Sequence, residues 1–280
     1  MRWSGILATM IKTVFITGAS SGIGRAAALY FAGQGWNVAA TVRTVKSDDV
    51  DFAKFSAIRQ YQLDVTDGES IQAAIRVAVK DFGSIDVLVN NAGYGTVGAF
   101  EASTPEQVQK QFDVNVFGLM NVTRLMLPIF RKQGQGKIIN ISSMGGRLAF
   151  PLYSIYHATK WAVDGFSESL MYELAGLNIG VKIIEPGTIK TQFTGRSAVK
   201  LTKTGLDAYS AYETKIAKNY EATYENAASP ELVAKTIYKA ATDESSRLRY
   251  VVGAPAPMLM LLRRILPESL FFAGVRHQTK

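Results

Sequence analysis

Short apolar runs rich in β-branched residues alternate with amphipathic stretches from residue 11 to about residue 253. This alternation predicts a parallel sheet covered by helices on both faces, because each parallel strand returns through a crossover helix. The predicted strands are 13–17, 37–42, 57–64, 86–90, 137–142, 181–185 and 248–252, and the predicted helices lie around 24–34, 70–82, 105–132, 154–176 and 230–242. We therefore expect a single doubly wound α/β domain with a seven-stranded parallel sheet.

Three segments are expected along the chain. Residues 1–10 are interpreted as a flexible leader, too short for a secretory signal, and Met10 is an equally good start. Residues 11–253 form the α/β domain, including a polar, tyrosine-rich and strandless loop at 188–229 that would open onto a ligand crevice. Residues 254–280 form an apolar helical extension.

The C-terminal extension carries an apolar stripe, because Met258, Leu261, Leu262 and Ile265 follow helical spacing. Packing on the chain's own core, a lid over the substrate cleft, a subunit interface and a membrane-surface contact all fit this pattern. We favour a lid, because the sheet is complete at Val252 and a substrate must be screened from water. No stretch is long and apolar enough to span a bilayer.

The composition excludes several kinds of chemistry. The 280 residues contain no cysteine and only two histidines, which excludes disulfides, thiolate catalysis and cysteine-based metal sites. A formal net charge of +8 suits a polyanionic ligand, but the basic residues are spread out and form no nucleic-acid-binding motif. We therefore expect no metal and no nucleic-acid partner, with chemistry from hydroxyls, amines, carboxylates or a bound cofactor.

A glycine-rich loop follows the first predicted strand and opens a helix rich in alanine. The loop contains Gly18, Ser20, Ser21, Gly22, Ile23 and Gly24. Its three glycines allow a tight turn and close approach of the backbone to a pyrophosphate, and the helix N-terminus offers unpaired N–H groups. The loop therefore predicts a dinucleotide cofactor.

The second strand indicates which dinucleotide binds. An NAD site usually carries an acidic residue roughly 20 positions beyond the loop, whereas the 2′-phosphate of NADP needs a cation there. This chain has Arg43 directly after the second strand, with Lys46 nearby and the first acidic residue at Asp48. We therefore expect a preference for NADP(H), with NAD(H) as the alternative.

Tyr156 and Lys160 are spaced i, i+4 on a predicted helix, which places the phenol and the ammonium on one face. A nearby ammonium favours the phenolate, so the tyrosine becomes a usable acid or base near neutral pH. Ser143 directly follows the predicted strand 137–142, and its spacing to the tyrosine makes it a better candidate than Ser142. His157 points about 100° away from Tyr156 and is expected to pack rather than catalyse.

Further motifs complete the pattern: Asn91-Ala92-Gly93 after the fourth strand, Asn115 within the long helix, and residues 186–191 after the sixth strand. With these motifs in order from residue 13 to about 252, the chain resembles the classical short-chain dehydrogenase/reductase family, which has a Rossmann-type fold. The resemblance implies that Tyr156 is the catalytic acid or base and that Ser143 polarises the substrate oxygen. It also implies that Lys160 lowers the tyrosine pKa and binds the nicotinamide ribose, while Asn115 anchors a water.

The resemblance also implies which residues hold the cofactor. Besides the glycine-rich loop, they are Arg43, Asp64, Val65, Asn91, Ala92, Gly93, Tyr156, Lys160, Pro186, Gly187, Ile189 and Thr191. The implied reaction is hydride transfer between the nicotinamide and a carbonyl or secondary alcohol of a small molecule.

The segments expected to line the substrate pocket, 94–99, 146–153 and 188–229, indicate an apolar substrate such as a retinoid, steroid or lipid-like ketone. An NAD(H)-linked alcohol dehydrogenase, an epimerase related in sequence and a non-catalytic NADP(H)-binding sensor are the alternatives. The motifs and length of the chain favour the reductase over the epimerase. We also expect a soluble, cytoplasmic homo-oligomer, either a dimer or a tetramer.

Overall fold

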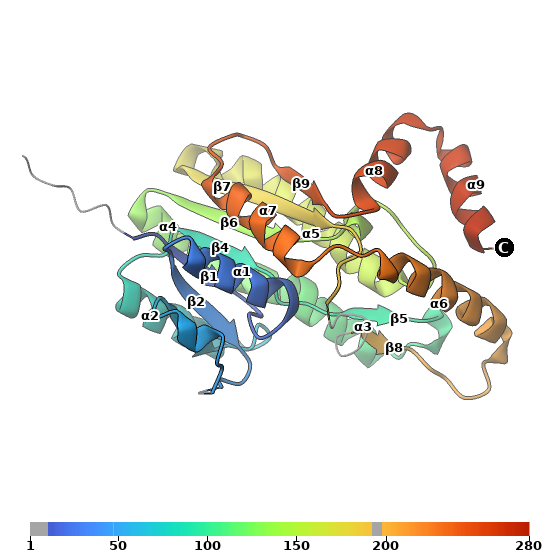
Figure 1. Cartoon of the computed structure of the whole chain (residues 1–280), viewed down its shortest axis with the longest axis horizontal. Coiled ribbons are helices and arrows are strands. Elements are labelled where there is room, and N and C mark those ends of the chain that lie inside the picture. Colours follow the sequence, from blue (N-terminus) through green and yellow to red (C-terminus); the bar gives the residue numbers. More distant parts are fainter. Residues whose placement is uncertain (1–10, 47, 192–197, 280) are drawn as a thin grey trace, which may run out of the picture.

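A computed structural model describes residues 11–46, 48–191 and 198–279. The expected leader at 1–10 and positions 192–197 of the expected loop lie outside the described residues. The centre of the molecule is a seven-stranded sheet in the order β3-β2-β1-β4-β6-β7-β9 (Figure 1). Its strands are β1 (Thr13–Ile16), β2 (Asn37–Val42), β3 (Ile58–Gln62), β4 (Val87–Asn90), β6 (Gly136–Ile141), β7 (Ile179–Pro186) and β9 (Arg249–Val252). All neighbouring strands are parallel, so the expected Rossmann-type α/β fold and its seven strands are confirmed.

Helices cover both faces of this sheet because successive side chains of each strand point to opposite faces. Val14 and Ile16 of β1 belong to one apolar core, which also contains residues of α1 (Gly22–Gly33) and α7 (Pro230–Thr242). Phe15, between them, belongs to the other core. That core is formed with α2 (Gly68–Phe82), α4 (Leu119–Gln133) and α5 (Ser154–Leu174).

The strand order creates a ligand crevice. From β1 the chain runs outward through β2 and β3, and then crosses to β4 on the other side of β1. The loops that follow β1 and β4 therefore separate at the carboxyl edge of the sheet, where open α/β folds bind their ligands.

The predicted helix at 105–132 is confirmed, but it contains a π-helical turn that the sequence did not predict. It consists of α3 (Pro105–Phe112), a π-helical turn at Asp113–Gly118, and α4. At Gly118 the turn approaches Val65 so closely that an added Cβ would lie 2.8 Å from the valine methyl Cγ2. Such turns insert an extra residue into a helix and are frequent at functional sites.

The predicted absence of strands from the segment 188–229 is wrong. It contains β8 (Ala198–Lys200), which pairs in parallel with β5 (Gly95–Val97), and the helix α6 (Ser210–Glu225). The three-residue β8 carries no alternating pattern that a sequence could reveal. β5 and β8 form a separate two-stranded sheet, which lies at the same end of the molecule as α6 (Figure 1).

The C-terminal segment forms two helices, α8 (Ala256–Ile265) and α9 (Glu268–Thr279). They separate at Leu266, whose extended backbone precedes Pro267. The helices pack on the molecule through Met260 and Phe271, which share an apolar cluster with Leu148.

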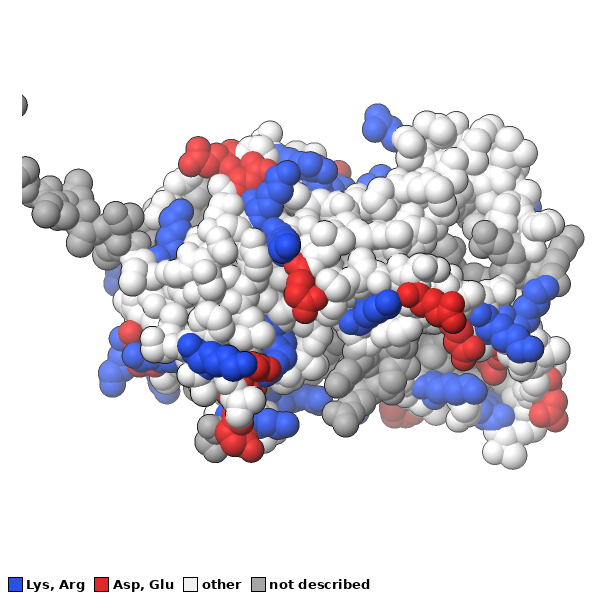
Figure 2. Space-filling model, viewed as in Figure 1, with Lys and Arg blue, Asp and Glu red and all other residues white. Residues whose placement is uncertain are grey.

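The predicted apolar stripe therefore faces mostly solvent and not the rest of the molecule. Met258, Leu261 and Ile265 are 59%, 57% and 62% exposed, and only Leu262 packs on the cluster that holds the tail. Figure 2 shows a largely uncharged surface over α8 and α9. Among the described helices, none has the length and apolar character needed to cross a membrane.

Candidate active site

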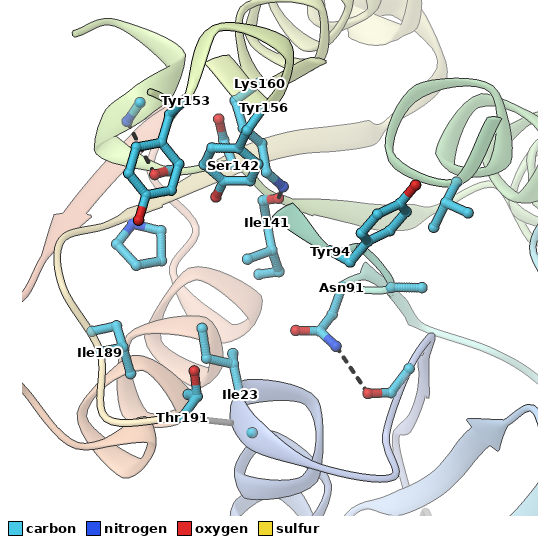
Figure 3. A pocket seen from close by; sticks show the side chains of 18 of the residues that line it. Ile23, Asn91, Tyr94, Ile141, Ser142, Tyr153, Tyr156, Lys160, Ile189 and Thr191 are labelled. Atoms are coloured by element: carbon cyan, nitrogen blue, oxygen red, sulfur yellow. Dashed lines mark hydrogen bonds between the residues drawn. The ribbon is translucent and has the colours of Figure 1, made fainter. Parts of the chain in front are cut away.

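A cavity of about 790 Å³ lies at the carboxyl edge of the sheet (Figure 3). Its lining includes residues that directly follow β1, β4 and β6 and residues at the end of β7, and the tail contributes Leu259 and Val275. Of the predicted site residues, all except Gly24 and Asn115 line this cavity. The topology thus brings together motifs that are as much as 173 positions apart in the chain, from Gly18 to Thr191.

The N-terminus of α1 is built to receive an anion. Gly18 and Gly22 have positive φ angles of +68° and +57°, which side chains rarely adopt. Ser21 precedes the helix without making a side-chain cap, and the first turn has no acidic residue. Gly24 allows the helix to pack closely, since an added Cβ would lie 2.4 Å from the Gly18 carbonyl oxygen. The exposed N–H groups and the helix dipole suit a pyrophosphate.

Asn91 fixes this glycine-rich loop to the end of β4. Its side-chain Nδ2 donates to the carbonyl oxygens of Thr17 and Gly18, at 2.9 and 3.1 Å. The Thr17 hydroxyl accepts in return from the backbone N–H groups of Asn91 and Ala92, at 2.9 and 3.0 Å. Asn91 thus positions the loop as well as lining the cavity.

The far end of the cavity carries the groups expected to contact the adenosine. Arg43 is exposed and follows β2, and Asp64 follows β3. Hydrogen bonds from the side chain and backbone of Thr66 lower the pKa of Asp64. Asp49 is bound by Arg25 through two hydrogen bonds of 2.5 and 2.6 Å. Asp49 directly follows Asp48 in the sequence, and this ion pair neutralises its charge.

Tyr156 and Lys160 lie on the first two turns of α5, and the lysine Nζ is 5.7 Å from the centre of the tyrosine ring. Figure 3 shows Tyr156, on α5, and Tyr153, which directly precedes α5, projecting into the cavity across from Ile189. Lys160 is buried, and its ammonium donates to the carbonyl oxygen of Ile141 at 2.9 Å.

Desolvation dominates the titration of this pair. It raises the pKa of Tyr156 to about 12, while a hydrogen bond with the Ser143 side chain acts in the opposite direction. It lowers the pKa of Lys160 to about 8, against the attraction of the Asp164 carboxylate. Desolvation therefore outweighs the Ser143 hydrogen bond in setting the pKa of Tyr156, and the implied lowering of that pKa by Lys160 stays a prediction.

Ser142 and His157 have structural contacts. The Ser142 hydroxyl donates to Asp164, behind the cavity wall. The Nε2 atom of His157 accepts from the Phe150 N–H at 3.1 Å, so the proton lies on Nδ1, which donates to the Gly145 carbonyl at 3.0 Å. The packing role expected for His157 is confirmed, and the ring holds the loop that follows β6.

Asn115 connects two walls of the cavity from behind. Its Oδ1 accepts from the Tyr94 N–H at 3.0 Å. Its Nδ2 donates to the Tyr94 carbonyl at 2.8 Å and to the Thr159 hydroxyl at 3.1 Å. The π-helical turn aims the side chain at the loop after β4 and at α5. The implied role as a water anchor stays a prediction.

Sequence reasoning missed several lining residues as individuals. They include Tyr153, Tyr220, Leu259 and Val275. The first two fall within segments that were expected to line the pocket, but only the fold selects which positions of these segments face it. For the tail, the available signal was its apolar character, which does not specify a face.

Comparisons with known proteins agree with this geometry. A family model described as short chain dehydrogenase matches residues 12–201. An uncharacterized oxidoreductase of Schizosaccharomyces pombe is 40% identical over 220 residues, which cover 78% of this chain and 91% of that protein. A 3-ketodihydrosphingosine reductase of Bacteroides thetaiotaomicron is 35% identical over 267 residues, which cover 95% of this chain and 97% of the reductase.

Solved structures are similar over most of the chain. A short-chain dehydrogenase from Streptomyces avermitilis has a TM-score of 0.82 and 34% identity, covering 98% of this chain and 100% of its own. ElxO with NADP bound has a TM-score of 0.71 and 30% identity, covering 86% and 98%. A 3-ketoacyl-(acyl-carrier-protein) reductase from Brucella melitensis complexed with NADH has a TM-score of 0.70 and 25% identity, covering 88% and 98%.

Proposed function

The chain belongs to the short-chain dehydrogenase family, and from this premise we propose that it is an NADP(H)-dependent oxidoreductase acting on a small, apolar carbonyl compound or the corresponding secondary alcohol. The observation that carries the proposal is one cavity lined by a glycine-rich helix N-terminus at one end and by Ser143, Tyr156 and Lys160 at the other. A dinucleotide has the polarity and length to connect the two ends.

The polar groups of the cavity match the needs of carbonyl reduction. A bound nicotinamide supplies the hydride in this direction and accepts it in the other. The Ser143 and Tyr156 hydroxyls would donate hydrogen bonds to the substrate oxygen and stabilise the negative charge that develops there. Because burial keeps the pKa of Tyr156 high, the phenol holds a proton that it can give to this oxygen. The Lys160 ammonium would then stabilise the phenolate.

The preference for NADP(H) over NAD(H) rests on the charges beside β2. Arg43 lines the cavity and is exposed there, so its guanidinium can reach a 2′-phosphate. Asp49, which could have repelled that phosphate, is paired with Arg25. The NADP-bound and NADH-bound relatives leave both cofactors open for this family, and Arg43 favours NADP(H) here.

The preference for an apolar substrate rests on the remaining wall of the cavity. Aromatic and aliphatic side chains dominate it, including Tyr94, Phe150, Ile216, Leu259 and Val275. The similar 3-ketodihydrosphingosine reductase acts, by its name, on a ketone with a lipid-like chain. We propose a substrate of this kind for the present chain.

We further propose that residues 11–253 are the catalytic domain and that 254–280 form a lid over its substrate end. Leu259 of α8 and Val275 of α9 line the cavity, and α9 lies against α6. These contacts would exclude water from the substrate during transfer.

Turnover of a ketone panel tests the proposal. We expect the parent protein to oxidise NADPH in the presence of an apolar ketone, followed by absorbance. Tyr156→Phe should abolish turnover and leave the NADPH Kd nearly unchanged, because the phenol acts mainly on the substrate oxygen. Lys160→Met should weaken both turnover and binding. Substantial turnover by Tyr156→Phe would refute the assignment.

A further inference from the structure

Two buried carboxyl groups lie behind the catalytic residues and take no part in the reaction proposed above. Asp164 follows Lys160 by one turn of α5, and Glu185 lies on β7. Their exposed fractions are 4% and 0%. Buried carboxylates are expensive, so a fold that places two together needs a physical account.

Two arginines lie within ion-pair distance of the two carboxyl groups, but farther away than a hydrogen bond. The Asp164 Oδ1 atom accepts from the Ser142 hydroxyl, while Oδ2 is 3.7 Å from Arg249 Nη2. The Glu185 oxygens are 3.5 Å from Arg249 Nε and 3.7 Å from Arg147 Nη1. These distances are too long for hydrogen bonds, so Asp164 Oδ2 and both Glu185 oxygens are buried without a conventional partner.

A proton shared between the carboxyl groups would resolve this deficit. A protonated carboxyl is a donor, so one proton allows Glu185 and Asp164 to hydrogen-bond each other. Desolvation is the largest cause raising the pKa of each group, and the charge of Asp164 further raises the pKa of Glu185, to about 7. Asp164 retains the negative charge more readily, because the Ser142 hydroxyl and the Lys160 ammonium both favour its ionised form.

Charged and hydroxyl groups from several elements act on Asp164. They are Lys160 on α5, Ser142 after β6, Glu185 on β7 and Arg249 on β9. Arg249 also binds Glu168 on α5, and Arg147 lies beyond Glu185. The backbone also packs tightly against Asp164, since a Cβ added at Gly146 would lie 2.6 Å from Asp164 Oδ1. A rigid, dry surrounding of this kind keeps the carboxylate at a fixed position relative to the lysine.

We propose that Asp164 and Glu185 form a buried pair carrying one proton and one negative charge, and that this charge holds Lys160 as an ammonium ion. Asp164 is then a positioning residue for the reaction, because it acts through Lys160 and touches neither substrate nor cofactor. Glu185 sets how much negative charge Asp164 carries. The charge state of Lys160 does not depend on the proposed function. Only the role of Lys160 in the reaction rests on that function.

The direction of the effect follows from the charges. Burial lowers the pKa of Lys160 to about 8, and Asp164 opposes this shift. Asp164→Asn removes the opposing charge, so Lys160 should lose its proton at a lower pH than in the parent. Glu185→Gln leaves Asp164 as the single carboxyl of the pair, so the negative charge stays beside Lys160 and the lysine titration should not move downward.

A direct test follows the lysine side-chain nitrogen by NMR in the cofactor-free full chain, with Lys160→Met identifying the signal. We expect the titration midpoint to fall by about one pH unit in Asp164→Asn, a tenfold change in proton affinity. The alkaline limb of kcat should shift downward by a similar amount while KM stays unchanged. Asp164→Glu, which keeps the charge, should restore part of the parent behaviour.

Glu168→Gln is the matched control. Glu168 lies on the same helix, is exposed and binds the same Arg249 at 3.0 Å, so its loss disturbs the ion-pair network without removing charge beside Lys160. The proposal is overturned if Asp164→Asn leaves the lysine titration in place, or if Glu168→Gln shifts it equally. If Asp164→Asn does not fold, a downward shift in Glu185→Gln overturns the proposal and an unchanged or upward midpoint supports it. Absence of turnover with a shifted NMR midpoint would refute the proposed function and leave this inference standing.

Discussion

Arg43→Leu should reduce the preference for NADPH over NADH. The guanidinium is exposed and has room to meet a 2′-phosphate at the cavity end formed by β2. A charge-assisted hydrogen bond is worth roughly 1.5–3 kcal/mol, and exposure to solvent places this contact at the lower end. We therefore expect the NADPH Kd to rise about tenfold, equivalent to ~1.4 kcal/mol, while the NADH Kd stays within a factor of two.

Titration of cofactor fluorescence with parent and variant gives both constants. Lys46→Leu is the matched control, because it removes the same charge from the same segment at a position that does not line the cavity. Raising the salt concentration should weaken the parent's preference and leave that of Arg43→Leu nearly constant. Combining Val42→Asp with Arg43→Leu should reverse the order of the cofactors. Equal affinity of the parent for NADPH and NADH, or an unchanged ratio in Arg43→Leu, would refute the reasoning.

Three further changes probe other parts of the site. Gly24→Ala should abolish NADPH binding or destabilise the fold, since its Cβ would lie 2.4 Å from a backbone oxygen, whereas Gly33→Ala on the same helix meets nothing within 4 Å and should be tolerated in thermal melts. Ser143→Ala should lower kcat. Ser142→Ala should instead lower the free energy of unfolding in urea by ~1–3 kcal/mol, because Asp164 loses its hydroxyl partner. Equal effects of the two variants on kcat would contradict the choice of Ser143 as the catalytic serine. Truncation after Gly253 should raise the substrate KM with the NADPH Kd unchanged, and an unchanged KM in a folded product would remove the lid.

Local patterns predicted the sheet and most of the site. Strands buried on both faces appear as continuous apolar runs, and the glycine spacing of the phosphate loop reflects a turn that only glycine at Gly18 and Gly22 adopts without strain. Parallel strands end at one edge of the sheet, so residues that follow different strands, such as Asn91 and Ser143, were expected to converge there.

Features that depend on tertiary packing could not be predicted from local sequence patterns. Whether α8 buries Met260 or Met258 depends on which surface it meets, and both faces of that helix are apolar. Asn115, in the π-helical turn, binds Tyr94 and Thr159, which are distant in sequence. The raised pKa of Tyr156 reflects desolvation, which residue spacing cannot reveal.

Deuterium transfer tests the central claim most directly. The protein would be incubated with an apolar ketone and NADPH deuterated at the nicotinamide C4, and the product alcohol analysed by mass spectrometry. The account predicts one deuterium on the carbinol carbon with the parent, and none with Tyr156→Phe under conditions where that variant still binds NADPH. Transfer at the parental rate by Tyr156→Phe would contradict the account. So would an alcohol product that carries no deuterium with either of the two NADPH preparations, each labelled on one face of C4.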